Sequence, residues 1–155
     1  MTNSFTPPAT ENLTWTEYSS LLTAGVDKRL LAGLYASGNL WARTVDGHRT
    51  VFLAEGAAFR LDRPKTFWAT TSEPFIGSES YDRATFYREP LLVHETPLDW
   101  LKAGKEGIVI LSWEHYWPLY LADVPVIRTL NISFGRRLSA SLKHPLPLPE
   151  IQVAA

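Results

Sequence analysis

Residues 90–121 read PLLVHETPLDWLKAGKEGIVILSWEHYWPLYL, and this stretch decides the expected fold. Two short aliphatic runs, LLV and IVIL, have the length and branching of buried strands. Between them lies PLDWLKAGKE, which has the spacing of a short helix. The runs PVIRTL (125–130) and SFGRRLSASLKH (133–144) continue the alternation. Because strands joined by helices form parallel sheets, this half predicts a βαβαβα unit with a small, partly parallel sheet.

The first half of the chain changes from a helical to a strand pattern. Residues 14–25 and 27–38 each begin with a capping residue and end at a glycine, which predicts two short helices. The Asp-Gly pair 46–47 between strand-like runs predicts a β-hairpin. Residues 72–84 are expected to form a loop and residues 85–95 an extended segment. The predicted class is α+β, with N-terminal helices and a β-hairpin before the βαβαβα half.

Length and composition limit the classes of function. The 155 residues are expected to form a flexible N-terminus (1–12) and a single α+β domain (13–155). The net charge of −1 excludes a global attraction to nucleic acid or to an anionic membrane. The lack of cysteine excludes disulfides and thiol catalysis and favours a cytoplasmic location. No apolar run is long enough to span a bilayer, so no membrane partner is expected.

Polar side chains follow each strand predicted in the second half. His94 and Glu95 follow the first strand, residues 112–115 (Ser-Trp-Glu-His) the second, and residues 131–133 (Asn-Ile-Ser) the third. Ligands gather at the carboxyl ends of parallel strands, so these positions are where chemistry is sought. Glu95, His94 and Glu114 are the candidate acid and base groups.

The LLVHE run resembles the start of a Toprim domain, the nucleotidyl-transfer and strand-cleaving module of primases and topoisomerases. In that family a glutamate follows the first strand, where this chain has Glu95. The resemblance covers residues 90–143. The third strand leads into LNISFG, without the family's Asp-x-Asp metal site, so the resemblance implies a loss of that catalysis and an origin in a bacterial mobile element.

A segment between the last strand and the last helix offers a second candidate site. Asn131, Ser133, Arg136 and Arg137 can bind an anion at the start of the helix. The alternative is a capped helix with solvent-exposed arginines. No G-x-G-x-x-G or P-loop motif supports a nucleotide cofactor, and none is predicted.

A metal site is not predicted either. His94, Glu95, Glu114 and His115 have ligand chemistry, but adjacent His-Glu pairs point their side chains apart in extended structure. The alternative is that both histidines are hydrogen-bonded polar caps at strand ends.

The hairpin carries the candidate nucleic-acid contacts Arg43, His48 and Arg49, with Trp41 and Phe52 beside them. Basic and aromatic side chains together suit phosphates and bases, and the alternative is an ordinary exposed hairpin tip.

Three aromatic residues after the second strand, Trp113, Tyr116 and Trp117, are the candidate protein interface. The alternative is that they belong to the core.

Every catalytic motif in the chain is incomplete, so the sequence favours a small non-catalytic binding or regulatory module. A protein partner is the first expectation and nucleic acid the second. The alternative is an enzyme acting on a phosphorylated or nucleotide substrate, with Glu95 as the acid or base and Arg136 and Arg137 as the anion clamp.

Overall fold

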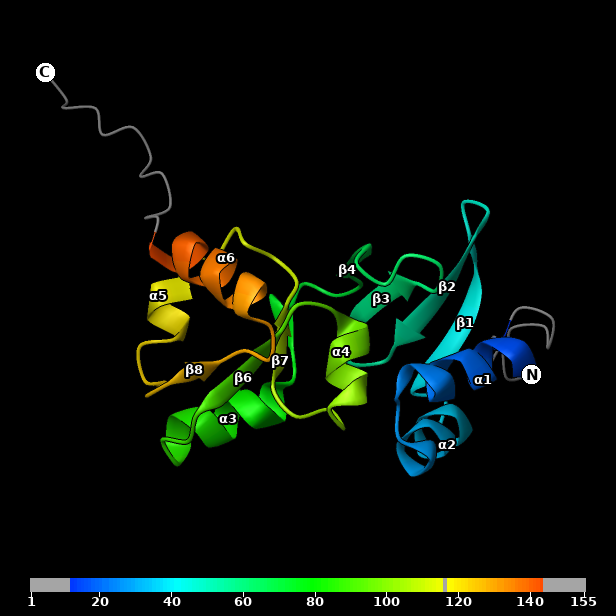
Figure 1. The fold of residues 1–155 in the computed structure, drawn as a ribbon, viewed down its shortest axis with the longest axis horizontal. Helices are drawn as coiled ribbons and strands as arrows, with labels where there is room; N and C mark the ends of the chain where they lie inside the picture. Colours follow the sequence, from blue (N-terminus) through cyan, green and yellow to red (C-terminus); the bar gives the residue numbers. More distant parts are fainter. Residues whose placement is uncertain (1–11, 116, 144–155) are drawn as a thin grey trace, which may run out of the picture.

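A computed structural model describes residues 12–115 and 117–143 of the chain. Its elements follow one another in the order α1 (Trp15–Ala24), α2 (Lys28–Ala36), β1 (Leu40–Val45), β2 (His48–Leu53), β3 (Ala57–Arg60), β4 (Phe67–Ala69), β5 (Phe75–Ile76), α3 (Ser78–Phe86), β6 (Leu91–His94), α4 (Pro97–Lys102), β7 (Ile108–Ile110), α5 (Trp117–Tyr120), β8 (Ile127–Arg128) and α6 (Ile132–Lys143). Figure 1 shows two groups of strands with α4 between them. The predicted α+β class is confirmed.

The two N-terminal helices begin with the caps that the sequence predicts. The Thr14 hydroxyl accepts a hydrogen bond from the N–H of Glu17, whose carboxylate accepts one from the N–H of Thr14. The helix α1 ends at Gly25, which has a left-handed φ of 114°. Asp27 caps α2 by accepting hydrogen bonds from two backbone N–H groups. These caps fix where each helix starts, so that its apolar residues face the first sheet.

Strands β1 to β4 form an antiparallel sheet in chain order. The pairing of Val45 with His48 leaves Asp46 and Gly47 as a two-residue turn, and both have positive φ, 50° and 80°. That backbone matches the twist of a tight hairpin and explains the Asp-Gly pair.

The second sheet has the strand order β5-β7-β6-β8. Its central strand β6 runs parallel to β7 on one side and to β8 on the other, and β5 is antiparallel to β7. The chain passes from β6 through α4 to β7, then returns through α5 to β8 on the far side of β6. The strand order therefore reverses at β6, which is a topological switch point.

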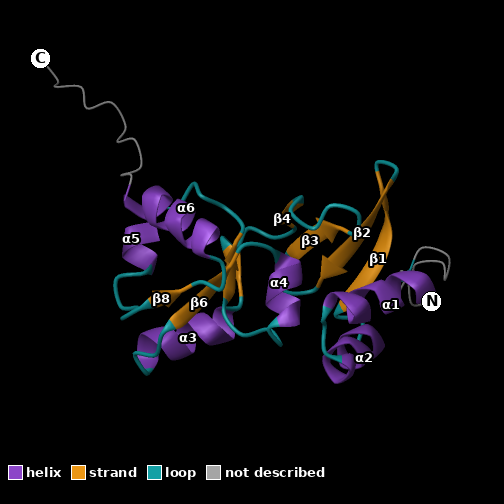
Figure 2. Cartoon of the chain, in the orientation of Figure 1, coloured by secondary structure: helices purple, strands orange, loops and turns teal. Residues whose placement is uncertain are grey.

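Two clusters of buried apolar side chains hold the helices and the two sheets together. The first contains residues of α1, α2, α4 and the first sheet, and it reaches Val109 of β7. At its centre Trp100 is 1% exposed and donates its Nε1–H to the carbonyl of Gly107 at 2.9 Å. The second cluster contains residues of α3, α5, α6 and the second sheet. The second sheet thus has helices on both faces, as Figure 2 shows.

The prediction for residues 72–95 is wrong where the structure forms the helix α3. A loop and then an extended segment were expected, whereas Ser78–Phe86 is helical and the strand begins only at Leu91. The helix packs through Ala84, which is 1% exposed, and through Ser80, whose hydroxyl accepts the N–H of Gly107 at 2.9 Å. Because this buried stripe is narrow and made of small residues, the helix has little apolar periodicity for the sequence to show.

The connection from β7 to β8 contains only a four-residue helix, α5, with Pro118 at its second position. None of the helices in the described part of the chain is long and apolar enough to cross a membrane. Of the N-terminal segment 1–12, expected to be flexible, residues 1–11 lie outside the described residues.

Candidate functional site

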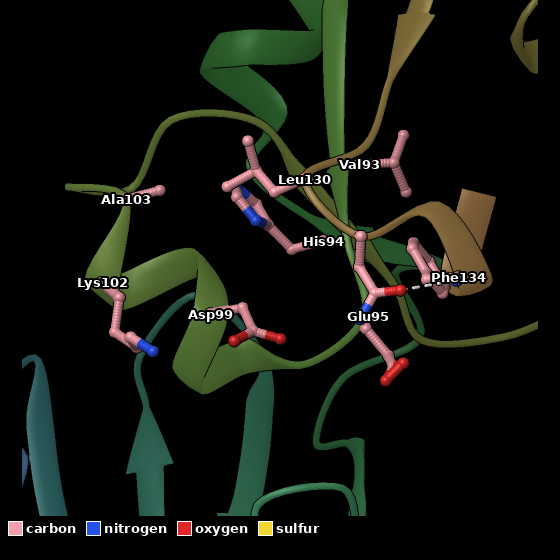
Figure 3. A pocket seen from close by; sticks show the side chains of 9 residues that line it. Val93, His94, Glu95, Asp99, Lys102, Ala103, Leu130 and Phe134 are labelled. Carbon is pink, nitrogen blue, oxygen red and sulfur yellow. Dashed lines mark hydrogen bonds between the residues drawn. The ribbon is translucent and has the colours of Figure 1, made fainter. Parts of the chain in front are cut away.

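The carboxyl ends of β6 and β8 meet at the switch point, and polar residues predicted from the sequence gather there. Two hollows, of about 390 and 350 Å³, open at this edge and share His94, Glu95 and Phe134 in their walls. Figure 3 shows the larger hollow, lined from the end of β6, from α4 and from the start of α6. Ligands of open α/β sheets bind at such a place.

Glu95 is held by two cations from different elements. Arg137 of α6 places Nη2 2.6 Å from Glu95 Oε2, and Lys65, in the loop before β4, places Nζ 3.6 Å from Oε1. The Glu95 side chain is 17% exposed. The carboxylate thus fastens α6 and the first sheet's loop to the end of β6. It also points away from the ring of His94, as Figure 3 shows, so the two candidate acid and base groups do not face each other.

His94 is buried and hydrogen-bonded. Its Nε2 lies 2.7 Å from the carbonyl oxygen of Glu106. Burial is the main cause that lowers the pKa of His94, and this favours the neutral ring. Glu114, the third catalytic candidate, is exposed on the loop after β7.

The four residues of the candidate anion site have different surroundings in the structure. Asn131 caps α6, because its Oδ1 accepts the N–H of Phe134 at 3.0 Å. Arg137 pairs with Glu95, while Ser133 and Arg136 are exposed. One arginine is therefore engaged by an acid and the other faces solvent.

The two described tryptophans after β7 differ in their burial. Trp117 is 3% exposed and donates its Nε1–H to the Ser112 carbonyl at 3.0 Å. Trp113 is 43% exposed and lies against it, with 6.5 Å between ring centroids. His115 has an edge contact with Tyr120. Tyr116 lies outside the described residues, so Trp113 is the exposed member of this set that the structure shows.

A second candidate surface lies on the first sheet. Cross-strand partners share a face, and the register aligns Trp41, Phe52, Ala58 and Trp68 in one row across all four strands. The rings of Trp41 and Phe52 are stacked, with centroids 5.7 Å apart and planes 7° apart. Both tryptophans are half-buried. Ala58 is small, and it separates the stacked Trp41 and Phe52 on one side from Trp68 on the other.

The next row on the same face is basic. It contains Arg43, Thr50 and Arg60. The Arg43 guanidinium carbon lies 4.8 Å from the centroid of the Phe52 ring. Within residues 12–115 and 117–143 neither arginine has an acidic partner within ion-pair distance. We call this surface the aromatic-arginine face; it is formed by Trp41, Arg43, Phe52, Arg60 and Trp68.

The opposite face of this sheet is the one that packs on helices. It carries Leu40, Ala42, Val51 and Phe59, which join residues of α1, α2 and α4 in the first cluster. Figure 2 shows α1 and α2 together on one side of the sheet. None of the residues of the aromatic-arginine face belongs to either apolar cluster in the described part of the chain.

The three candidate nucleic-acid contacts of the hairpin do not all lie on the same face of the sheet. Arg43 and His48 share the aromatic-arginine face, and His48 Nδ1 lies 3.9 Å from Asp62. Arg49 lies on the other face, where its guanidinium donates to both carboxylate oxygens of Glu17 at 2.8 Å. These hydrogen bonds from Arg49 are the largest cause that lowers the pKa of Glu17 from 4.5 to about 2. Arg49 is thus part of the fold's framework.

Sequence reasoning missed Arg60, Trp68 and Lys65. The strands AAFR and KTFWATT were recognised only as short extended runs, and the register that places Trp68 beside Ala58 depends on the turn between them. Alternation within each run gives the correct faces once this register is known.

Comparison with protein-family models, curated proteins and solved structures finds no match to this chain. Across the described residues, no group of three or more histidine or acidic side chains is placed to share a metal ion.

Proposed function

We propose that the chain is a module that binds single-stranded nucleic acid, and that the aromatic-arginine face is the contact surface. The observation that carries the proposal is the pair of rows on this face. Trp41 and Trp68 provide half-buried rings, while Phe52, only 9% exposed, supports the Trp41 ring by stacking on it. Arg43 and Arg60 provide cations without acidic partners among the described residues.

Each row supplies one of the two interactions that single strands use. Aromatic side chains stack on the faces of unpaired bases, at about 1–3 kcal/mol per base, and arginines pair with phosphates. In a duplex the base faces are covered by their neighbours, so Trp41 and Trp68 have no surface on which to stack. The geometry therefore favours a single strand lying across the sheet.

The predicted attraction comes only from the arginines at the surface itself, and it depends on the salt concentration. The whole chain has a net charge of −1, so long-range attraction does not contribute. Each phosphate contact in a single strand contributes about 0.7 to the slope of log affinity against log salt. Contacts from Arg43 and Arg60 together give a slope of about −1.4, and stacking adds affinity that salt hardly changes.

Fluorescence anisotropy with a labelled oligothymidine of about 12 nucleotides tests the proposal. Trp41→Leu is expected to weaken binding by about 5- to 160-fold, because one stacking contact is lost. The double variant Arg43→Ala with Arg60→Ala is expected to reduce the salt slope by about 1.4.

Matched controls carry the same types of substitution elsewhere on the surface. Trp15 is 76% exposed on α1, and Arg29 is exposed on α2. Trp15→Leu and Arg29→Ala are expected to leave the affinity and the salt slope unchanged. Equal losses in the control and test variants, or no binding by the parent chain, would contradict the proposal.

The enzyme hypothesis has one observation in its favour, which is the position of Glu95 at the switch point between two hollows. Its ion pairs with Arg137 and Lys65 must open before it can accept a proton from a substrate. Glu95→Gln separates the two functions: turnover of a phosphorylated or nucleotide substrate should collapse in an enzyme, while nucleic-acid binding through the first sheet should not change.

A protein partner is supported by the exposed Trp113, which is the alternative contact for a regulatory module. The proposed location is the cytoplasm, because a chain without cysteine is suited to a reducing compartment.

A further inference from the structure

The larger hollow at the switch point has polar groups with a defined hydrogen-bonding pattern. It measures about 390 Å³ and lies on the second sheet, away from the aromatic-arginine face on the first. Its walls combine the apolar Val93, Leu130 and Phe134 with the polar His94 and Asp99. A volume of this size suits a small organic molecule.

The hydrogen bond from His94 fixes the tautomer of the ring. A carbonyl oxygen only accepts, so the nitrogen 2.7 Å from the Glu106 oxygen, Nε2, must carry the hydrogen. In the neutral ring Nδ1 then has a free lone pair. No hydrogen bond to Nδ1 is formed within the described residues, and this nitrogen is not among the atoms that are buried without a partner. Nδ1 is therefore an acceptor without a partner that is not fully buried, and the ring that carries it lines the hollow.

A second acceptor stands opposite. The carboxylate of Asp99, on the first turn of α4, faces the same open space as the His94 ring, as Figure 3 shows. Its Oδ2 accepts a hydrogen bond from the Thr96 hydroxyl at 2.9 Å, which holds the carboxylate in place.

Each acid in the walls of the hollow has a cation nearby. Asp99 is followed one turn later on α4 by Lys102, and Glu95 is paired with Arg137 and Lys65, which lie outside the larger hollow. A neutral ligand therefore fits better than a cation, because neither carboxylate is left without an opposite charge. Its apolar body can lie against Leu130 and Phe134 while its hydrogen-bond donor reaches the histidine.

We propose that this hollow binds a small neutral heteroaromatic amine, whose N–H group donates a hydrogen bond to Nδ1 of His94. The site is independent of the nucleic-acid surface, and it needs no change in the ion pairs of Glu95.

Nuclear magnetic resonance of the ¹⁵N-labelled full chain tests the proposal at the atom concerned. The probes are 2-aminopyrimidine and its matched control 2-(dimethylamino)pyrimidine, which has the same ring but no N–H. We expect 2-aminopyrimidine to move the Nδ1 resonance of His94 in a saturable way at millimolar concentration. The dimethyl compound should bind about tenfold more weakly, as expected for the loss of one hydrogen bond.

Two variants separate binding from folding. In His94→Gln the side-chain amide can still donate to the Glu106 carbonyl, but its acceptor oxygen does not occupy the position of Nδ1, so binding should weaken about tenfold in a folded chain. Ala103→Leu keeps the histidine and fills the hollow from the capping residue at the end of α4. It should abolish binding.

Three results would overturn the proposal. They are an Nδ1 resonance that does not respond to 2-aminopyrimidine, an equal response to both probes, and undiminished binding by Ala103→Leu. If His94→Gln fails to fold, the Ala103→Leu variant and the comparison of the two probes still decide the question.

Discussion

Replacing Glu17 by glutamine removes the ion pair that fastens α1 to the hairpin β1–β2. The carboxylate is 16% exposed and accepts hydrogen bonds from Nε and Nη2 of Arg49, each at 2.8 Å. These bonds are the largest cause that lowers the pKa of Glu17 to about 2, and burial acts in the opposite direction. Glutamine keeps the shape of the side chain and its cap on Thr14 but removes the charge.

The lowered pKa determines both the size and the pH dependence of the effect. A fall from 4.5 to about 2 corresponds to at most about 3 kcal/mol of stability. The Arg49 side chain is 28% exposed, and screening by water reduces the expected value to about 1–2 kcal/mol. Because the pKa is lower in the folded state, this stability is complete above about pH 4.5 and is lost as the pH falls toward 2.

Urea unfolding followed by far-ultraviolet circular dichroism, at several pH values between 7 and 2, measures this contribution. We expect Glu17→Gln to lower the free energy of unfolding by about 1–2 kcal/mol at pH 7, and we expect the difference from the parent chain to vanish near pH 2. Glu79→Gln is the matched control, since Glu79 also lies in a first helical turn and is exposed. A difference of the same size at pH 7 and pH 2, or none at pH 7, would refute the reasoning.

Two further substitutions test the framework of the second sheet and its helices, each by urea unfolding. Gly77→Ala should cost about 2 kcal/mol or more, because Gly77 has a φ of 96° and a Cβ there would overlap the carbonyl of Gly107. Gly38→Ala has a positive φ in open space and should cost less, about 1 kcal/mol; equal costs would contradict the role of the overlap. Asn131→Ala should cost about 1 kcal/mol by removing the cap of α6, and an unchanged stability would show that the Asn131 side chain contributes little.

The parts of the fold that local chemistry specifies were predictable from the sequence. The caps at Thr14 and Asp27 and the turn at Asp46 and Gly47 act over three or four residues, and each is found where the sequence indicates. The strand that ends at His94 was also found, because an aliphatic run of this length has few other structures.

Contacts between distant segments were not predictable in the same way. The separation of Arg43 from Arg49 follows from strand alternation, but the pairing of Arg49 with Glu17 requires α1 to pack on the hairpin. The ion pair of Glu95 with Arg137 joins residues 42 positions apart. The sequence therefore identified the chemical groups at the switch point, whereas only the packed structure shows that an arginine holds the glutamate.

The most direct test of the central claim is to map the contact with a single strand on the ¹⁵N-labelled chain by nuclear magnetic resonance, using oligothymidine. The account predicts that the largest shifts occur at the backbone amides of β1 to β4 and at the indole N–H groups of Trp41 and Trp68. A duplex of the same length should cause much smaller shifts. The account would be contradicted if the shifts clustered around Glu95 and Trp113, or if the single strand and the duplex gave the same response.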